Sequence, residues 1–407
     1  MEMKIMYISY AASGKDLEYF SDKYMNGRAL KAPQQTFDYT IAKGLLDRNI
    51  KPQFLSIPPI PSFPKSKVIF YKGGEGKTNS EIKFMPLINI PIVKYIWIFF
   101  YCLIKILFFS ILKKNNNYKK VLLINWPLFS VMFGGIIARK ITKLKVIQIV
   151  PDLPEDYLKY NKSIGFQKAL KLLDHLKPPI IHLMDGYILL TEFMNEKVNK
   201  KNKKYLVLEG IANISDFEGK SIEKHKSNKK IIMYAGALNE KVGILKLANS
   251  IKLYNNDPNL ELWIFGDGDA SEKIKELSKN CSNIVYHGTK FRDEILQYEL
   301  KVDLLINPRP SVEEYTKYSF PSKTLEYMLS GTPLLTTKLP GIPQEYFDYV
   351  FSIEDESELG IMNKIQDVLD LNESELSDVG KKASQWVKKN KSKEIQIKKI
   401  ISFLENC

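Results

Sequence analysis

Cysteine and histidine are scarce in this sequence of 407 residues. The three cysteines, Cys102, Cys281 and Cys407, stand singly, with no paired spacing. This pattern argues against a disulfide framework and a cysteine-based zinc site, and it is typical of a reducing compartment. The four histidines do not pair at metal-ligand spacing either.

Targeting signals and repeats are also missing. The first residues, MEMKIMYISY, form a short β-like run without the charged start and apolar core of a signal peptide. No low-complexity segment and no repeat of solenoid period occurs. We therefore expect a cytoplasmic protein.

Acidic residues are outnumbered, 46 against 60 basic ones, which gives a formal charge of +14. Such a surplus fits anionic partners, namely phosphates, a membrane surface or nucleic acid, or simply a lysine-rich solvated surface. No basic–aromatic surface motif accompanies the charge, so we do not expect nucleic-acid binding.

Only one apolar run, Tyr95–Leu112, is long enough to suggest a membrane. Spanning is disfavoured because Lys105 would lie near mid-bilayer and the flanking strands would be separated. Lys94, Tyr101 and Lys105 fall near one helical stripe, beside a broad apolar face. We expect residues 90–114 to lie at the inner face of a membrane, with a helix buried against the sheet as the alternative.

The rest of the chain predicts an α/β protein with two doubly wound, Rossmann-like domains. Its length exceeds one typical core, and 44% hydrophobic residues exclude a disordered chain. Short apolar runs alternate with helical segments, which is typical of parallel sheets covered on both faces. In the first half we predict a polar loop at 11–27, helices at 36–47 and 165–176, and strands at 4–9, 52–57, 68–71, 121–124, 146–150 and 186–191.

The pattern restarts after a polar stretch, Asn213–Asn228, which is a linker candidate. Further strands are expected at 231–235, 260–265, 284–287, 303–306 and 334–337, and one long basic helix at 383–405. We predict an N-terminal domain 1–210, a linker 211–228, a C-terminal domain 229–383 and a final helix 384–407. Two such domains would place a ligand cleft at the carboxyl ends of their strands.

The most informative segment is 307–337, NPRPSVEEYTKYSFPSKTLEYMLSGTPLLTT. An apolar strand ends before it, a polar loop carries Arg309, and Ser322 is placed to cap the next helix. Free N–H groups at that helix start, with Lys323 and Arg309, suit a pyrophosphate. Glu326 lies on the same helix face as Lys323 and can accept hydrogen bonds from a sugar hydroxyl pair. Together these features predict a nucleotide-sugar site.

Other strand ends add weaker candidates. Glycines at Gly236, Gly266 and Gly268 allow a backbone to approach a ligand, although many strand–helix turns carry them. Further residues at the predicted strand ends complete the predicted donor site: Ala237, Lys241, Asp267, His287, Phe320, Pro321, Ser322 and Thr324. Asp152, in VPDLPED, is either a catalytic contact or a turn carboxylate. The segment 71–78, YKGGEGKT, lacks the first glycine of a phosphate loop, so we expect a turn there.

These segments together resemble the retaining glycosyltransferases of family 4, which have the GT-B fold. The similarity is strongest in YAGALNEKVG, LWIFGDGD, VDLLINPR and FPSKTLEYMLSGTPLLTT, and fainter in VPDLPED and DGYILLTEFMNEKV. It implies a donor held by the C-terminal domain, an acceptor held by the N-terminal domain, a cleft between them, a final helix that crosses back, and no metal or other cofactor. Glu326 matches the second of two family glutamates, which contacts the donor ribose.

The sequence departs from the family at two positions. Tyr318 stands where the first glutamate is expected, and Ala237 where an arginine is common. Glu313 or Glu314 is a candidate to replace the glutamate's contact, and Arg309 and Lys323 are candidates to supply the missing charge.

The resemblance implies a retaining, metal-independent hexosyltransferase acting on a lipid-linked or polysaccharide acceptor in capsule, exopolysaccharide or O-antigen assembly. As catalytic candidates we take Lys323, Arg309 and Asp152. Two alternatives remain: a nucleotide-sugar epimerase of the same fold, and a non-enzymatic scaffold at the membrane.

Overall fold

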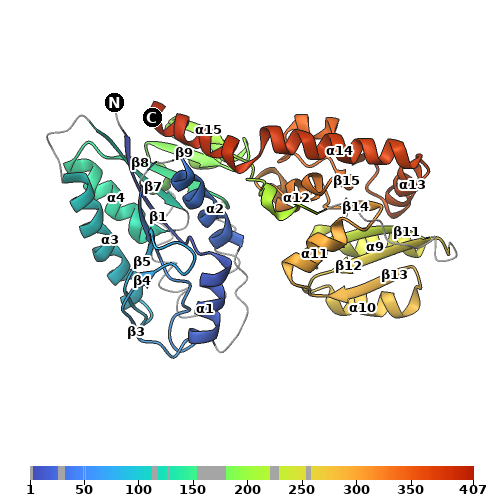
Figure 1. Ribbon diagram of the computed structural model, residues 1–407, viewed down its shortest axis with the longest axis horizontal. Helices are drawn as coiled ribbons and strands as arrows, with labels where there is room; N and C mark the ends of the chain where they lie inside the picture. Colours follow the sequence, from blue (N-terminus) through green and yellow to red (C-terminus); the bar gives the residue numbers. More distant parts are fainter. Residues whose placement is uncertain are drawn as a thin grey trace. The chain divides into compact units, whose positions relative to one another are not determined.

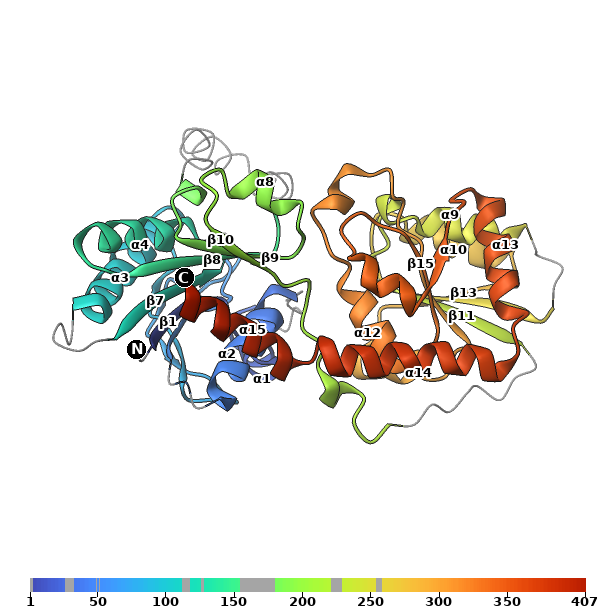
Figure 2. The ribbon, with the colours of Figure 1, turned by 90° about the horizontal axis from the view of Figure 1, so that it is seen from above.

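The computed structural model describes residues 3–25, 33–48, 50, 52–111, 118–125, 128–153, 180–220, 229–253 and 258–407. The chain divides into two compact units, whose elements are shown in Figures 1 and 2. Unit 1 comprises Met1–Leu208 together with Gln396–Cys407, and unit 2 comprises Glu209–Ile395. The first division precedes the predicted linker, and the second lies within the predicted final helix.

Unit 1 is built on a sheet with the strand order β10-β9-β8-β7-β1-β2-β5-β4 among the described residues. Neighbouring strands are parallel except β4 and β5. Burial on both faces explains the continuous apolar runs of the central strands. The strands are β1 (Met3–Ser9), β2 (Gln53–Ser56), β4 (Gly74–Glu75), β5 (Ile82–Phe84), β7 (Lys119–Asn125), β8 (Lys145–Val150), β9 (Gly186–Leu189) and β10 (Lys204–Val207).

Helices cover both faces of this sheet (Figure 1). Gly135 of α4 (Phe129–Ile141) faces Leu122, and α4 packs beside α3 (Val93–Ile111). Tyr7, which is level with Leu123, points to the opposite face and bonds to Asp38 of α2 (Pro33–Asp47). Unit 1 also contains a short antiparallel pair, β3 (Phe70–Tyr71) and β6 (Leu87–Ile88). Its other described helices before residue 204 are α1 (Gly14–Tyr24) and α8 (Met194–Val198).

Unit 2 holds a parallel sheet with the order β13-β12-β11-β14-β15-β16. Alternate side chains point to opposite faces: Ile232 and Ile264 join a core with α9, α10 and α13, whereas Phe265 lies against α11. The strands are β11 (Lys230–Ala235), β12 (Leu260–Phe265), β13 (Ile284–Gly288), β14 (Leu304–Asn307), β15 (Leu334–Thr337) and β16 (Phe351–Ile353). The helices are α9 (Ile244–Lys252), α10 (Ser271–Asn280), α11 (Arg292–Glu299), α12 (Ser322–Ser330), α13 (Glu358–Leu369) and α14 (Glu373–Asn390).

The predicted polar loop at 11–27 is wrong, because α1 (Gly14–Tyr24) occupies most of it. Ser13 and Asp16 form a reciprocal capping box that satisfies the first N–H groups of this helix. Phe20 is buried against Phe84, which anchors the helix to the sheet. The capping box and the buried Phe20 thus stabilise a helix in a stretch that is polar in sequence.

Two further predictions need correction. The run 68–71 is not a strand of the main sheet, because only β3 forms there and it pairs with β6. The single helix at 383–405 is two helices, α14 and α15 (Lys393–Asn406), which are separated at Lys391 and Ser392. Lys391 is buried there between carboxylates, and this tertiary contact coincides with the break. The helix predicted at 165–176 lies outside the described residues.

The remaining predicted strands at 4–9, 52–57, 121–124, 146–150 and 186–191, and those of the second half, are confirmed within a few residues, as is the helix at 36–47. The predicted linker is partly ordered onto unit 2, where Ile214–Asp216 form a 3-10 turn. Residues 221–228 lie outside the described part.

The apolar run forms α3, and among the described residues only this helix is long and apolar enough to cross a membrane by length and composition. A third of its most apolar window is buried. β1 precedes α3 and β7 follows it, yet these strands are paired along their length in one sheet. A single crossing would separate them, so α3 lies along unit 1. Lys94 is not on an exposed stripe with Lys105, because it is buried and donates to the Ile60 carbonyl at 2.6 Å.

Candidate active site

The strand order of unit 2 places its topological switch point between β11 and β14. The chain leaves β11 toward β12 on one side, whereas β14 and β15 extend the sheet on the other. Loops that follow these two strands therefore diverge and leave room for a ligand at the carboxyl edge. Most of the predicted donor residues lie on these loops, on the turn after β12 or on α12, and His287 lies within β13.

The turns after β11 and β12 are locked together by backbone hydrogen bonds. The Gly236 N–H donates to the Phe265 carbonyl at 3.0 Å, and the Leu238 N–H to the Asp267 carbonyl at 3.1 Å. Gly266 has φ +132°, and a Cβ there would collide with the Gly236 carbonyl oxygen. Close packing of the two turns therefore requires this glycine, whatever it does for a ligand.

The side chains on these turns have different surroundings. Ala237 and Lys241 are exposed. The Asp267 carboxylate accepts from the Ser271 hydroxyl at 3.0 Å, and that hydroxyl accepts from the Gly268 N–H at 2.8 Å. Asp267 and Gly268 thus organise the start of α10, a structural role that the sequence prediction did not include.

The loop between β14 and α12 is tied to the turn after β11. The Tyr315 hydroxyl donates to the Lys241 carbonyl at 3.1 Å, and Gly243, at φ +79°, packs against the Pro308 carbonyl. The Tyr234 hydroxyl donates to the Ala237 carbonyl in this turn at 2.9 Å. Arg309 lies close enough for its charge to influence the pKa of Tyr234. Burial raises the pKa of Tyr234 to about 12, and Arg309 opposes this rise.

Helix α12 begins at Ser322, so the prediction that Ser322 caps it is wrong. Pro321 is the capping residue and offers no side-chain acceptor. Within the described chain, the N–H groups of Ser322 and Lys323 therefore have no acceptor and are available to an anion. Phe320 packs against Tyr346 at 5.4 Å, and Thr324 is buried.

Tyr327 fixes α12 to the end of β11. Its hydroxyl accepts from the Ala235 N–H at 2.8 Å and donates to the Ala235 carbonyl at 3.1 Å. The start of α12 and the turn at Gly236 are thus held at one edge of the sheet.

A chain of alternating charges runs beside the start of α12. Lys323 contacts Glu299 at 3.1 Å and also pairs with Glu326. Arg292 contacts both Glu326 and Asp216 at 2.7 Å. Sequence reasoning missed Arg292, Glu299 and Asp216, which come from separate segments and have no local motif.

Burial and neighbouring charges shift the pKa values of Glu299 and Glu326 in opposite directions. Burial raises the pKa of Glu299 above its usual range. Burial acts in the same direction on Glu326, but Lys323 and Arg292 outweigh it and lower the pKa of Glu326. The pKa values of the two carboxyl groups therefore shift in opposite directions, although both groups contact Lys323.

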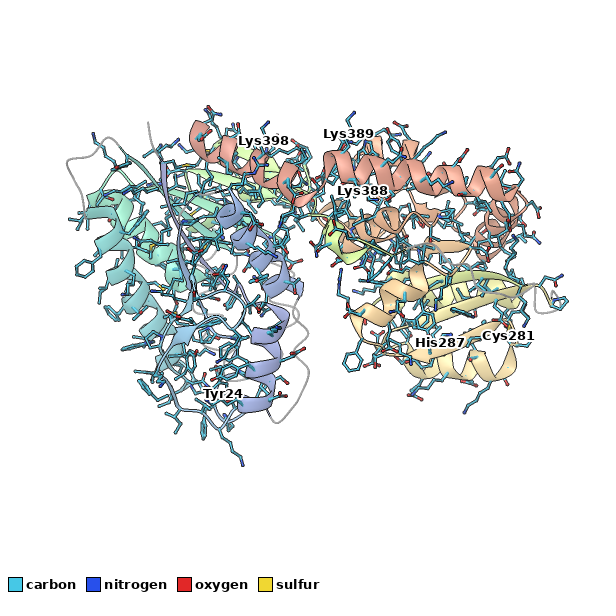
Figure 3. All side chains as sticks on the ribbon, viewed as in Figure 1. Tyr24, Cys281, His287, Lys388, Lys389 and Lys398 are labelled. Carbon is cyan, nitrogen blue, oxygen red and sulfur yellow. The ribbon has the colours of Figure 1, made fainter. Side chains whose placement is uncertain are left out.

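His287 packs among aromatic rings. Its imidazole, labelled in Figure 3, stacks on Phe265 at 4.5 Å and meets Trp263 edge-on at 5.3 Å. Tyr298 of α11 lies 5.9 Å from it, on the same sheet face. Burial, with Lys290 nearby, lowers the pKa of His287, so the ring is neutral at pH 7. These contacts fix the orientation of the His287 ring, and its role in donor binding stays a prediction.

Residues 216–406 match the family described as Glycosyl transferases group 1. The whole chain also resembles sucrose-phosphate synthase from Thermosynechococcus elongatus, with a TM-score of 0.64, 14% identity, and coverage of 100% of this chain and 99% of that one. A glycosyltransferase from Rickettsia africae is similar with a TM-score of 0.62 and 16% identity, over 100% of this chain and 98% of that one. The fold is GT-B. A search of curated proteins finds no match.

The GT-B fold was predicted from the strand–helix pattern and from the resemblance of both halves, and the match of residues 216–406 agrees with the predicted glycosyltransferase type. Membership of family 4 and retention of configuration stay predictions. Asp152 belongs to unit 1 of this GT-B fold, where it is exposed at the end of β8. Within the described residues, no three His, Cys, Asp or Glu side chains are grouped so that they could hold a metal ion.

Proposed function

We propose that the protein is a retaining glycosyltransferase that moves a sugar from a nucleoside diphosphate sugar to a hydroxyl of a lipid-linked saccharide or polysaccharide. One observation carries the proposal: the open N-terminus of α12 lies at the switch point with Lys323 and Glu326 on one face. The pathway that fits is assembly of a surface polysaccharide such as capsule, exopolysaccharide or O-antigen.

The leaving diphosphate would be stabilised by the helix N–H groups, Lys323 and Arg309, without a metal. Ionised Glu326 would accept hydrogen bonds from the ribose hydroxyls. Unit 1, with Asp152, would hold the acceptor.

A similar structure supports a nucleoside diphosphate donor. The Anabaena protein HepE, crystallised in complex with UDP, has a TM-score of 0.54 and 13% identity over 100% of both chains. We extend this ligand class to the present chain as part of the proposal.

We further propose that unit 1 binds the cytoplasmic face of a membrane through an apolar surface on α3 and α4. Successive turns of α3 expose apolar side chains, and α4 extends the surface. Exposed Lys105 and Lys140 lie on the same two helices and suit anionic headgroups. The surface comprises Tyr95, Ile96, Phe100, Ile104, Phe108, Ile111, Phe133, Ile137 and Ile141.

Calorimetric titration with UDP, GDP, ADP and CMP tests the donor site without knowledge of the acceptor. We expect one nucleoside diphosphate to bind selectively, and Glu326→Ala to weaken it at least about tenfold, because a charged hydrogen-bond partner of the ribose contributes roughly 1.5–3 kcal/mol. Glu276→Ala, an exposed carboxylate of α10, is the matched control and should bind normally. Absence of binding by all four would favour the scaffold.

A further inference from the structure

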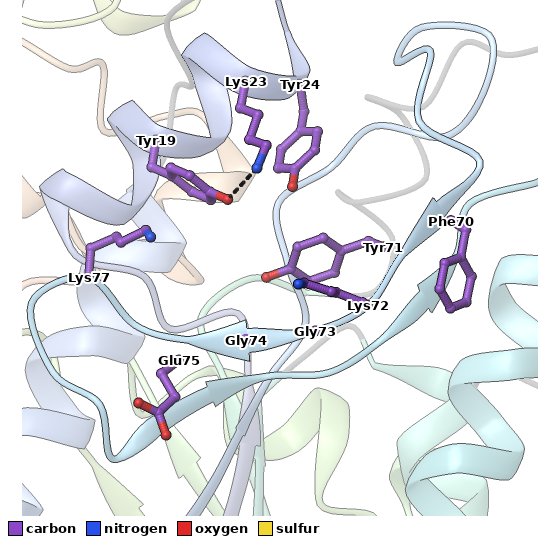
Figure 4. Close-up of a pocket in the computed structure, with 10 residues that line it drawn as sticks. All are labelled: Tyr19, Lys23, Tyr24, Phe70, Tyr71, Lys72, Gly73, Gly74, Glu75 and Lys77. Atoms are coloured by element: carbon purple, nitrogen blue, oxygen red, sulfur yellow. Dashed lines mark hydrogen bonds between the residues drawn. The ribbon is translucent and has the colours of Figure 1, made fainter.

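A pocket in unit 1 has no role in the donor chemistry. It encloses about 500 Å³ between α1 and the segment from β3 to β4 (Figure 4). Pockets of this size hold small ligands. Aromatic and basic side chains dominate the lining: Tyr19, Lys23 and Tyr24 from α1, with Tyr71, Lys72 and Lys77 from the opposite segment.

The wall of the pocket is held in place by polar contacts. The Lys77 N–H donates to the Asp16 carboxylate at 2.6 Å, and the Thr78 hydroxyl donates to Ser13 at 2.7 Å. These bonds fasten the segment to the capping box of α1. Gly73 has φ +84°, and a Cβ there would come within 2.9 Å of the Phe84 carbonyl oxygen. The glycine of YKGGEGKT is thus needed for the tight approach of this segment to β5.

The rings are also fixed. Tyr71 is buried and meets Tyr24 edge-on, with centroids 5.9 Å apart. Phe20 packs beneath both rings, at 5.8 Å from each. A preformed aromatic wall needs little ordering when a ligand binds.

Three lysines and one carboxylate, Glu75, line this pocket. Lys23 donates to the Tyr19 hydroxyl at 3.1 Å, and Lys77 lies 4.2 Å from the Tyr19 ring centre. Within the described chain, no carboxylate lies within ion-pair distance of Lys23, Lys72 or Lys77. Glu75 offsets only part of the charge of the three lysines, so the lining stays net positive and favours an anion.

We propose that this pocket binds a saccharide that carries an anionic group, either a carboxylate or a phosphate. The apolar C–H face of a sugar ring suits the tyrosine rings, and the anionic group suits the lysines. A nucleotide bound as in a phosphate loop does not fit, because Gly74 and Glu75 form β4, whereas the glycines of a phosphate loop lead directly into a helix. Gly74 pairs with Phe84, the last residue of β5, so the pocket lies toward the carboxyl edge of the sheet.

Identifying this saccharide as the acceptor rests on the proposed transferase function, whereas binding of the saccharide to the pocket does not. Saturation-transfer NMR with methyl glucuronide, glucose 1-phosphate and neutral methyl glucoside tests the binding itself. We expect one or both anionic sugars to bind at least about tenfold more tightly than the neutral one, and to weaken at high salt. Binding of methyl glucuronide would identify the anionic group as a carboxylate, and binding of glucose 1-phosphate would identify it as a phosphate.

Lys72→Gln with Lys77→Gln should abolish this preference, whereas Lys67→Gln, an exposed lysine outside the pocket, should leave it unchanged. Nucleoside diphosphate binding should be the same in all of these proteins. Equal binding of neutral and anionic sugars, no binding of any sugar, or an equal loss in Lys67→Gln overturns the pocket proposal. If the unmodified protein binds no nucleoside diphosphate, that result contradicts the proposed function and not the pocket proposal.

Discussion

Asp38 shows how one buried carboxyl joins three parts of unit 1. It is fully buried, accepts from the Tyr7 hydroxyl at 3.0 Å and the Tyr10 N–H at 2.9 Å, and also bonds to Asn125. Burial raises the pKa of Asp38 to about 7, against the opposing effect of these donors. The group therefore titrates near neutrality in the folded chain.

The raised pKa predicts a pH-dependent stability. Below pH about 4 the carboxyl is neutral in both the folded and the unfolded chain. As the pH rises toward about 7, only the unfolded chain loses the proton, so the free energy of unfolding falls by at most about 4 kcal/mol. Asp38→Asn should flatten this decline, as measured by calorimetric melting between about pH 5 and pH 8.

Asp22→Asn changes an exposed carboxylate of α1 and should keep the slope of the unmodified protein. Parallel slopes in Asp38→Asn and the unmodified protein would show that Asp38 does not titrate in this range.

At the candidate site, sequence reasoning succeeds where the signal is local. Lys323 and Glu326 are three residues apart on a helix that follows a strand, so their common face follows from the spacing. Glu299 and Arg292 could not be predicted as their partners, because those contacts depend on how α11 packs against α12. The same limit applies to His287, whose ring stacking depends on the pairing of β12 with β13.

Among secondary-structure elements, long apolar strands were predictable and short strands were not. β7 and β8 are buried on both faces and carry runs that few other elements produce. β3, β4 and β6 have two residues each, too few for any period to be visible. The segment 71–78 therefore read as a turn, although it forms one wall of the lysine-rich pocket.

The break between α14 and α15 illustrates a boundary without a local signal. No glycine or proline marks it; instead Lys391 is buried, with Glu209 and Glu345 each at 2.8 Å from its amine. Lys391→Ala should lower the free energy of unfolding by roughly 3–5 kcal/mol, because Glu209 would remain buried without its cation. Thermal unfolding followed by calorimetry measures this change.

Lys388→Ala removes an exposed lysine of α14 (labelled in Figure 3) and should change the free energy of unfolding by less than about 0.5 kcal/mol. Equal effects of the two substitutions would mean that the buried ion pair does not stabilise the helix junction.

For the whole molecule, the apolar surface of α3 and α4 predicts membrane recruitment. Phe100 and Phe108 are 54% and 59% exposed. Replacing both by serine should weaken binding to anionic vesicles by about 10²-fold, since each buried phenylalanine contributes at least about 1.5 kcal/mol. Sedimentation with vesicles gives the partition coefficient.

Leu253→Ser with Leu359→Ser removes equally exposed apolar side chains from unit 2 and should leave partitioning unchanged. The surface is not a membrane contact if the unmodified protein does not bind vesicles, or if the phenylalanine and leucine double variants bind them equally.

The return of α15 to unit 1 has a consequence for biosynthesis. The Glu405 and Asn406 carbonyls accept hydrogen bonds from Lys119 and Lys204, and Ile397, Ile400 and Leu404 are buried. A ribosome adds roughly 5–20 residues per second, and all of unit 2 is translated before these side chains emerge. The nascent first unit therefore waits many seconds without α15, and the surface that buries Ile397, Ile400 and Leu404 stays exposed to solvent during that time.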